Sequence, residues 1–172
     1  MYIGIDLGTS GVKTILVDKN QKILSTTHTS LTVHSPKDGY NEQHPKDWIL
    51  AIEKCLENLR KKNPLEFSST ISIGISGHMH GATLIDNKGD VIRPCILWND
   101  TRSYKECLDF EEQEFDVRSI SGNITMPGFT APKINWIKNN EIDNFKKIFK
   151  VLLPKDYLRF VLTGEFFSEM SD

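Results

Sequence analysis

The fold is decided by Tyr2-Ile-Gly-Ile-Asp-Leu-Gly-Thr-Ser-Gly-Val-Lys-Thr14. Tyr2 to Ile5 is a short apolar run typical of a buried strand, and Val12 to Val17 is a second, β-branched run. Between them stand Asp6 and the glycine-rich turn Leu7-Gly-Thr-Ser-Gly11, which carries two hydroxyls. The pattern predicts a hairpin in which backbone N–H groups and hydroxyls converge beside one carboxylate. Such groups suit a phosphate, and the carboxylate suits the metal ion that accompanies it.

Two other interpretations of this stretch were weighed. A P-loop is excluded because Lys13 follows Val12 rather than a glycine, and because the next residues indicate a strand rather than a helix. A glycine-rich hairpin that binds nothing remains open on the residues alone.

The composition is that of an ordinary globular domain. The chain has 172 residues, 26% of them charged, and a net charge of -2, so nothing indicates nucleic-acid binding. Its apolar runs are too short to span a bilayer, and Met1 leads straight into the first strand, so no membrane segment and no signal peptide are expected. Three cysteines without metal-ligand spacing indicate reduced thiols and a cytoplasmic protein.

The elements that follow the hairpin predict an α/β fold. Ile23 to Leu31 indicates a third antiparallel strand, and a helix is expected from Pro45 to near Lys62 with one apolar face. Thr70 to Ser76 then alternates like a strand, which the crossover helix would make parallel to the first strand. This order is that of a ribonuclease-H-like layer. The fourth strand would end beside the first, where open α/β sheets bind ligands.

The loop Ser76-Gly-His-Met-His-Gly81 lies at that place and has several interpretations. His78 and His80 could bind a metal, but no third ligand is near in the sequence. Gly74-Ile-Ser-Gly-His78 nearly forms the nucleophile elbow of an esterase, but its last position is not glycine. The loop could instead present imidazoles to a polar ligand, with glycines that allow close approach. A histidine that is simply satisfied within the loop remains the plainest alternative.

Further along, local patterns predict several elements. Ala82 to Asp86 and Val91 to Leu97 are expected to pair as strands through a tight turn. Trp98-Asn-Asp-Thr-Arg102 suits hydroxyl recognition, but Asn99 or Asp100 could equally cap a helix that runs to Glu112. A long packed loop, Ser121 to Lys133, precedes a helix that Thr130 could cap. A last helix begins at Pro154, with Gly164 as its C-terminal cap.

Ile5-Asp-Leu-Gly-Thr-Ser-Gly-Val-Lys13 resembles the first phosphate motif of the sugar kinase (hexokinase), Hsp70 and actin superfamily, in the form typical of FGGY carbohydrate kinases. The resemblance implies ATP and Mg²⁺ as cofactors. It places Asp6 near the magnesium and the transferred phosphoryl group. The residues implied near the phosphates are Gly8, Thr9, Ser10, Gly11 and Lys13.

Two more segments resemble the xylulokinase branch of that family. Ser76 to Gly81 is similar to its G-Q-M-H-G segment, which implies that Met79 and His80 contact the sugar, with His78 where the family commonly has glutamine. Trp98 to Arg102 is similar to its W-N-D-x-R pattern, although Thr101 stands where glycine is frequent. The sugar-cleft residues implied are therefore His78, Met79, His80, Asn99, Asp100 and Arg102. The run Gly122 to Lys133 resembles a run that borders the sugar cleft in that branch, which implies that it forms part of the cleft wall.

The resemblance covers the chain from 1 to 172 but only the first part of the first FGGY domain. It implies the N-terminal portion of an ATP-dependent kinase that converts D-xylulose to D-xylulose 5-phosphate. The catalytic base, an aspartate in a later G-G-D-N-like motif, would lie beyond these residues, so this portion alone should not turn over. It should self-associate, for example as a homodimer, or be marginally stable. The alternatives are a kinase for a related ketose or polyol, a non-catalytic sugar-binding module, and an actin- or Hsp70-type ATPase.

Overall fold

The computed structural model describes residues 1–112 and 117–169, which fall into two compact units. The first unit combines Met1–Val33, His44–His78 and Lys155–Phe167. The second combines His34–Gln43, Met79–Pro154 and the described residues after Phe167. The chain therefore passes from one unit to the other between His78 and Met79, within the histidine-containing loop. Each unit has its own core and is described by itself.

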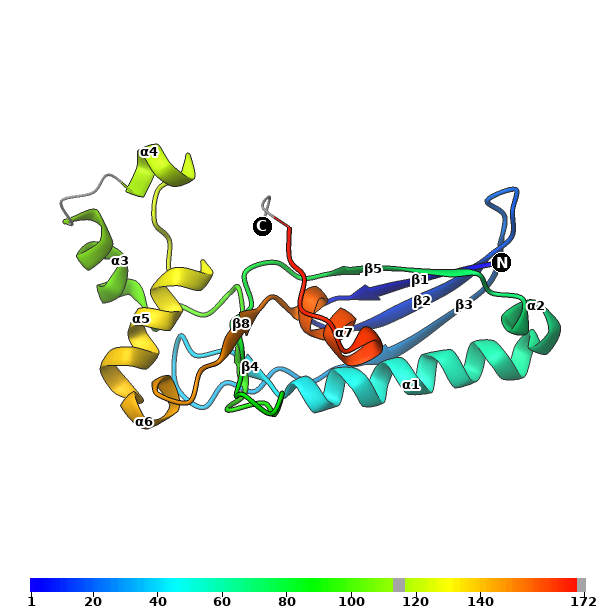
Figure 1. Cartoon of the computed structure of the whole chain (residues 1–172), viewed down its shortest axis with the longest axis horizontal. Coiled ribbons are helices and arrows are strands. Elements are labelled where there is room, and N and C mark those ends of the chain that lie inside the picture. Colours follow the sequence, from blue (N-terminus) through cyan, green and yellow to red (C-terminus); the bar gives the residue numbers. More distant parts are fainter. Residues whose placement is uncertain (113–116, 170–172) are drawn as a thin grey trace. The chain divides into compact units, whose positions relative to one another are not determined.

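The first unit is built on a four-stranded sheet with the order β3-β2-β1-β5 (Figure 1). β1 pairs antiparallel with β2 and parallel with β5, and β2 pairs antiparallel with β3. The expected order of three antiparallel strands, a crossover helix and a parallel strand is thus confirmed. Its elements are β1 (Tyr2–Leu7), β2 (Gly11–Val17), β3 (Ile23–Ser30), α1 (Pro45–Lys62), α2 (Pro64–Ser68), β5 (Ser72–Gly77) and α7 (Pro154–Thr163).

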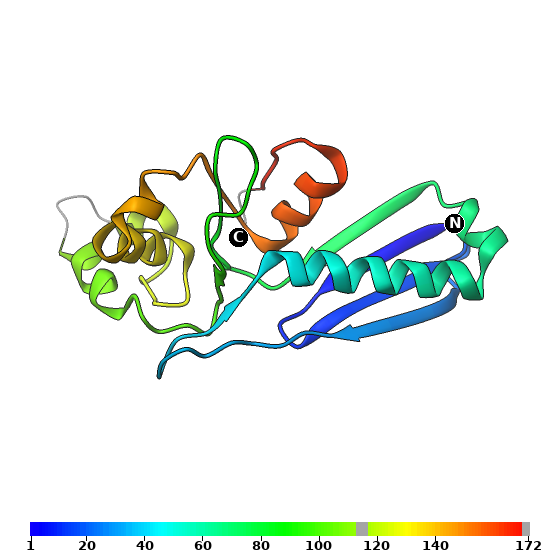
Figure 2. The same ribbon diagram turned by 90° about the horizontal axis from the view of Figure 1, so that it is seen from below.

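Helix α1 covers one face of that sheet (Figures 1 and 2). Pro45 stands in its first turn, and the side chain of His44 accepts a hydrogen bond from the N–H of Lys46. Its buried side chains recur at helical spacing and meet the inward-facing residues of the sheet. These core residues are Ile3, Ile5, Leu7, Val12 and Leu16 from the strands, and Trp48, Ala51, Ile52, Cys55 and Leu59 from α1.

Because side chains alternate along a strand, the opposite face of β1 carries Tyr2, Gly4 and Asp6. Asp6 and Tyr2 are exposed there. The residue that the sequence marked as functional therefore stands on the sheet face away from α1.

The second unit contains short strands and helices around Leu84, Ile96 and Ile137. Partly buried side chains such as Ile134 and Trp136 pack against these three. Its elements are β4 (Glu42–Gln43), β6 (Thr83–Ile85), β7 (Cys95–Ile96), α3 (Tyr104–Glu111), α4 (Val117–Ser121), α5 (Thr130–Asn140), α6 (Ile142–Phe145) and β8 (Lys150–Leu152).

The expected pairing of Ala82–Asp86 with Val91–Leu97 is confirmed only in part, because no continuous ladder joins the two segments. β6 pairs with β8, and β7 pairs with β4. The chain after the turn makes only isolated bridges, Ile85 with Val91 and Ala82 with Ile96. Pro94 explains this result because it has no N–H to donate to a strand ladder.

The expected helix caps of this unit are wrong. α3 begins at Tyr104 after Ser103, so neither Asn99 nor Asp100 is its N-cap. α5 begins at Thr130 itself, with Phe129 in the capping position and no side-chain cap. The cap expected at Gly164 is confirmed: its φ is +75°, and its N–H donates to the carbonyl of Phe160.

Within residues 1–112 and 117–169, no helix combines the length and apolar character needed to cross a membrane.

Candidate functional site

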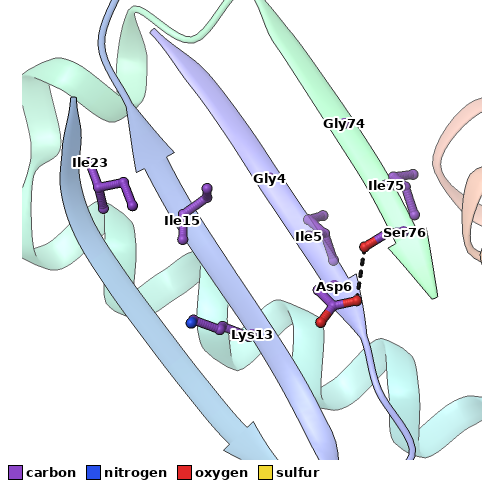
Figure 3. Close-up of a pocket in the computed structure, with 9 residues that line it drawn as sticks. All are labelled: Gly4, Ile5, Asp6, Lys13, Ile15, Ile23, Gly74, Ile75 and Ser76. Carbon is purple, nitrogen blue, oxygen red and sulfur yellow. Dashed lines mark hydrogen bonds between the residues drawn. The ribbon is translucent and has the colours of Figure 1, made fainter. Parts of the chain in front are cut away.

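The carboxylate of Asp6 is held by a side chain from a distant part of the chain. β1 and β5 run parallel in a register that places Asp6 beside Ser76. The Ser76 hydroxyl donates to Oδ1 of Asp6 at 2.8 Å (Figure 3). Both side chains are exposed, so the carboxylate is oriented by this hydrogen bond on an accessible surface.

The turn after β1 is closed by its own backbone. The N–H of Gly8 donates to the carbonyl of Gly11 at 3.0 Å, and the N–H of Leu31 donates to the carbonyl of Ser10 at 3.0 Å. A Cβ atom at Gly11 would lie 2.8 Å from the carbonyl oxygen of Thr29, so only glycine fits there. The turn is therefore rigid, with the side chain of Ser10 exposed at its tip.

Lys13 faces Asp6 across the β1–β2 ladder and is exposed. Figure 3 shows both side chains on the same face of the sheet. Directly opposed side chains of an antiparallel pair lie close together. The structure thus gathers an anion, a cation and two hydroxyl-bearing residues, Thr9 and Ser10, at one end of the hairpin.

An open depression of about 520 Å³ lies along this sheet face next to Asp6 (Figure 3). It is open because Gly4 and Gly74 stand side by side in the register and carry no side chains. Ile15 and Ile23 line the depression on the β2 and β3 side. Asp6, Lys13 and Ser76 supply its polar end.

The donor set of this end fits a phosphate-bound magnesium better than a metal site made by protein alone. Among the residues that the structure describes, no three His, Cys, Asp or Glu side chains gather where they could hold a metal ion. Mg²⁺ commonly takes one or two carboxylates and completes its shell with water and substrate phosphates. A single oriented carboxylate beside a lysine and two hydroxyls meets that requirement.

His78, which the sequence assigned to the sugar, lies in the first unit. Its ring is 9% exposed and packs edge-on against the indole of Trp48, with 5.5 Å between ring centroids. The backbone N–H of His78 donates to the carbonyl of Leu7 at the end of β1. His78 therefore ties the end of β5 to the hairpin, and its contact with a sugar stays a prediction.

Met79 and His80 belong to the second unit. Met79 is 53% exposed, and the half-buried ring of His80 lies 4.7 Å from the ring of Phe129. His80 has a φ of +59°, the left-handed region that residues other than glycine seldom adopt. An unusual backbone conformation thus fixes the direction of the His80 side chain.

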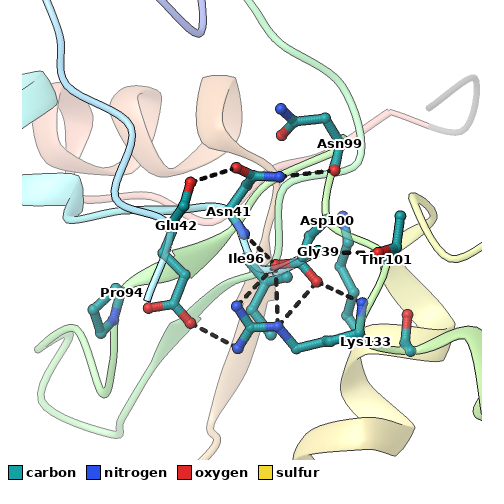
Figure 4. A network of polar contacts seen from close by, with 12 residues as sticks. Gly39, Asn41, Glu42, Pro94, Ile96, Asn99, Asp100, Thr101 and Lys133 are labelled. Carbon is teal, nitrogen blue, oxygen red and sulfur yellow. Dashed lines mark hydrogen bonds and ion pairs between the residues drawn. The ribbon is translucent and has the colours of Figure 1, made fainter. Parts of the chain in front are cut away.

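Asp100 lies in a buried polar network (Figure 4). Its carboxylate accepts hydrogen bonds from the N–H of Asn41 at 2.6 Å and from the N–H of Arg102 at 2.9 Å. The guanidinium of Arg102 also donates to both carboxylate oxygens, at 2.8 to 3.1 Å. The two side chains are 0% and 1% exposed. Asp100 and Arg102 therefore shape the second unit from within, whereas Asn99 is exposed beside them.

The network continues from Arg102 to Glu42, which also pairs with Arg93, and from Arg93 to Glu141 at 2.9 Å. Burial opposes the charge on Arg102, but the hydrogen bonds and charges of Asp100 and Glu42 outweigh burial and raise the pKa of its guanidinium. Arg102 is thus held in its charged form by Asp100 and Glu42.

The guanidinium of Arg102 is also enclosed by aromatic rings. Its central carbon lies 3.9 Å from the ring centroid of Tyr40 and 4.9 Å from that of Trp136. A pocket of about 440 Å³ opens here, with polar walls that include Glu42 and Glu141. The W-N-D-x-R segment is thereby locked to β4 and α5 inside the second unit.

Two residues of this arrangement were missed by sequence reasoning. Ser76 was included in the sugar loop, although the alternation of β5 puts it on the same face as Asp6. Lys133 was considered only as the end of a loop, yet it is fully buried. Its Nζ donates to the carbonyls of His80 and Gly128 at 2.7 and 2.6 Å.

Comparison with known proteins places this arrangement in a family. The model of the N-terminal domain of the FGGY family of carbohydrate kinases matches residues 1–172. The xylulose kinase of Escherichia coli (strain K12) is 48% identical over 172 residues, which are all of this chain and 35% of that protein. The chain spans about a third of the length of the curated relatives it matches.

Solved structures of carbohydrate kinases have the same fold as this chain. A crystal structure of a "xyloylose kinase" from Brucella ovis superposes with a TM-score of 0.93 at 54% identity, covering 95% of this chain and 34% of that one. Gluconate kinase from Lactobacillus acidophilus has a TM-score of 0.89 at 24% identity, covering 96% and 33%, a likeness of fold alone. On the family match over its whole length, the chain belongs to the FGGY family of carbohydrate kinases.

Proposed function

We propose that the chain is the N-terminal part of an ATP-dependent kinase that phosphorylates D-xylulose to D-xylulose 5-phosphate, and that it carries the phosphate-binding hairpin and part of the sugar wall. The observation that carries this proposal is the hydrogen bond from Ser76 to Asp6. This bond ties the carboxylate of Asp6, on β1, to β5, and β5 leads directly into the Met79-His80 loop. The names of the relatives, xylulose kinases at up to 48% identity, support xylulose as the sugar.

In this proposal the hairpin binds the nucleotide phosphates. ATP with Mg²⁺ supplies the phosphoryl group and the cation that neutralises charge as it transfers. Asp6 would hold the metal through its exposed carboxylate, and Ser76 would keep that carboxylate from rotating. The backbone and hydroxyls of Gly8 to Gly11, with the ammonium of Lys13, would orient the phosphates.

The second unit would supply the sugar wall. Met79 offers an exposed apolar surface, His80 an imidazole, and Asn99 an exposed amide. Asp100 and Arg102 would hold the wall in shape through their buried pair. In the reaction the 5-hydroxyl oxygen forms a bond to the γ-phosphorus while the bond to ADP breaks. The hydroxyl proton passes to a base that we place outside these 172 residues.

The test is an ADP-release assay on the full-length protein with D-xylulose, ribulose, fuculose and glycerol. A preference for D-xylulose is expected, together with a loss of at least about 100-fold in kcat for Asp6→Asn, the size of effect typical of a lost electrostatic contact to the transition state. Asp109→Asn is the matched control, because Asp109 is an exposed carboxylate on α3. It should leave kcat unchanged.

Activity on none of the four sugars would contradict the proposal. Sugar binding without ADP release would favour a non-catalytic sugar-binding module instead. Equal losses for Asp6→Asn and Asp109→Asn would remove the role assigned to the hairpin carboxylate.

A further inference from the structure

Lys133 is a fully buried cation in the first turn of α5. Burying an ammonium group is costly unless hydrogen bonds replace its water shell. Here both replacements are backbone carbonyls, those of His80 and Gly128. The lysine thus joins two loops that lie far apart in the sequence.

The carbonyl of His80 receives a second donor from the same helix. The hydroxyl of Thr130 donates to it at 3.2 Å, while Lys133 donates at 2.7 Å. The ring of His80 rests against Phe129, the residue before Thr130. Residues 129–133 therefore hold both the backbone and the side chain of His80.

This double hold has a structural reason. A left-handed φ at a residue other than glycine is strained, so it persists only where the surroundings enforce it. Among the described residues, the only non-glycine positions with positive φ are Gln21 and His80. Gln21 lies in a surface turn, whereas the left-handed His80 is held by a buried charge.

We propose that Lys133 is a positioning residue: by binding the carbonyl of His80 from within the second unit, it enforces the left-handed backbone that aims the His80 imidazole at the sugar. The role rests on the proposed function only for its effect on the sugar. The coupling between Lys133 and His80 can be measured without it.

The charge on Lys133 is sensitive to pH in an accessible range. Burial lowers the pKa of the ammonium to about 8. The titratable thiol of Cys95 and the charge of Asp100 act in the opposite direction, and the charge of Arg102 acts with burial. A neutral amine is a weaker donor than an ammonium, so the hold on His80 weakens as pH rises through this value.

The experiment uses the full-length protein with ¹³C-labelled histidine, and the His80 signal is identified by its absence in His80→Gln. The His80 signal should show an inflection near pH 8 that is absent in Lys133→Met. Lys138→Met is the matched control, an exposed lysine on the same helix, and it should keep the inflection.

Kinetics give the second readout. Lys133→Met should lower kcat/KM for the sugar by about 10- to 100-fold, the range expected for a lost charged hydrogen bond, while KM for ATP changes less than about twofold. Thr130→Val, which keeps the lysine, should shift the His80 signal and raise KM for the sugar by a smaller factor. This variant decides the question if Lys133→Met does not fold.

The inference is overturned if the His80 signal of both variants coincides with that of the wild type, or if the wild-type signal shows no inflection near pH 8. An inflection lost in Lys133→Met in a protein without sugar kinase activity would leave the positioning role standing and contradict the proposed function alone.

Discussion

Replacing Asp100 by asparagine tests whether the W-N-D-x-R segment is held together by a buried charge. The asparagine keeps the size of the side chain but turns one of two accepting oxygens into a donor. The groups hydrogen-bonded to either oxygen are donors: the N–H of Asn41 on Oδ2, the N–H of Arg102 on Oδ1, and the guanidinium of Arg102 on both. The change therefore sets donor against donor at a side chain that is 0% exposed.

The magnitude follows from burial and from the partners that remain. Removing one member of a fully buried ion pair costs about 3–5 kcal/mol. Arg102 keeps its contact with Glu42 at 2.7 Å and its place between Tyr40 and Trp136, so the loss should fall at the low end, about 3 kcal/mol. For a domain of this size that corresponds to about 6–12 °C in Tm.

The assay is urea unfolding, monitored through tryptophan fluorescence. Glu57→Gln is the control, since it makes the same chemical change in an exposed pair with Lys61, whose side chains are 51% and 66% exposed. The control should unfold at the wild-type urea concentration because exposed pairs of this kind contribute little.

A loss below about 1 kcal/mol for Asp100→Asn would refute the reasoning. If the same variant then lost sugar binding, Asp100 would be a ligand contact rather than part of the scaffold of the second unit.

Three further predictions follow from packing and burial. Gly128→Ala places a Cβ 2.4 Å from the carbonyl oxygen of Trp98 and should cost about 1–3 kcal/mol in urea unfolding, whereas Gly74→Ala, with nothing within 4 Å, should cost much less. Stability should rise between pH 8 and 9, because Lys133 loses its proton near pH 8 while an unfolded lysine keeps it to about 10.4. Above pH 9 the trend should reverse, because burial raises the pKa of Cys95 to about 12 and that of Cys107 to about 11, so that both thiols ionise first in the unfolded chain and together outweigh Lys133. Lys133→Met should abolish the rise in the same urea titration, and a flat wild-type profile would contradict the prediction. The three cysteines are buried, so a thiol reagent at pH 8 should label them only after urea is added, and rapid labelling of the native chain would show the burial to be wrong.

The first unit could be predicted from the sequence because its signals are local. Alternating isoleucines define β1 and β5, Pro45 and a regular apolar face define α1, and the handedness of crossovers then fixes the parallel pairing. The place of Asp6 near the end of β1 could be predicted on the same grounds. Its partner Ser76 could not, because the register of two strands 70 residues apart is set only by the packed sheet.

The strand pairing of the second unit could not be predicted, because its strands pair with partners far away in the sequence. The turn after β6 was correctly predicted: Gly89 has a φ of +88°, and the N–H of Asp86 donates to the carbonyl of Asp90. The returning chain is diverted at Pro94 and makes only two isolated bridges to the β6 segment, while the ladder of β6 is formed with β8. Nothing local in Lys150–Leu152 indicates that partner.

The burial of Lys133 could not be predicted for a related reason. A lysine in the first turn of a helix ordinarily reaches water. Only the carbonyls of two loops, which the sequence does not show to be near, turn this position into an interior one.

The parallel pairing of β1 with β5 also has a consequence for how the chain folds. The β1–β2 hairpin closes within its first 17 residues, whereas the contact that orients Asp6 waits for Ser76. Contacts between residues far apart in sequence form late, since a long loop must close first. During synthesis from the N-terminus, the hairpin should therefore be protected from hydrogen exchange well before its carboxylate is oriented. The turn Leu7–Gly11 is built early, but the carboxylate beside it gains its final geometry only when β5, the strand that leads into the Met79-His80 loop, has docked beside β1.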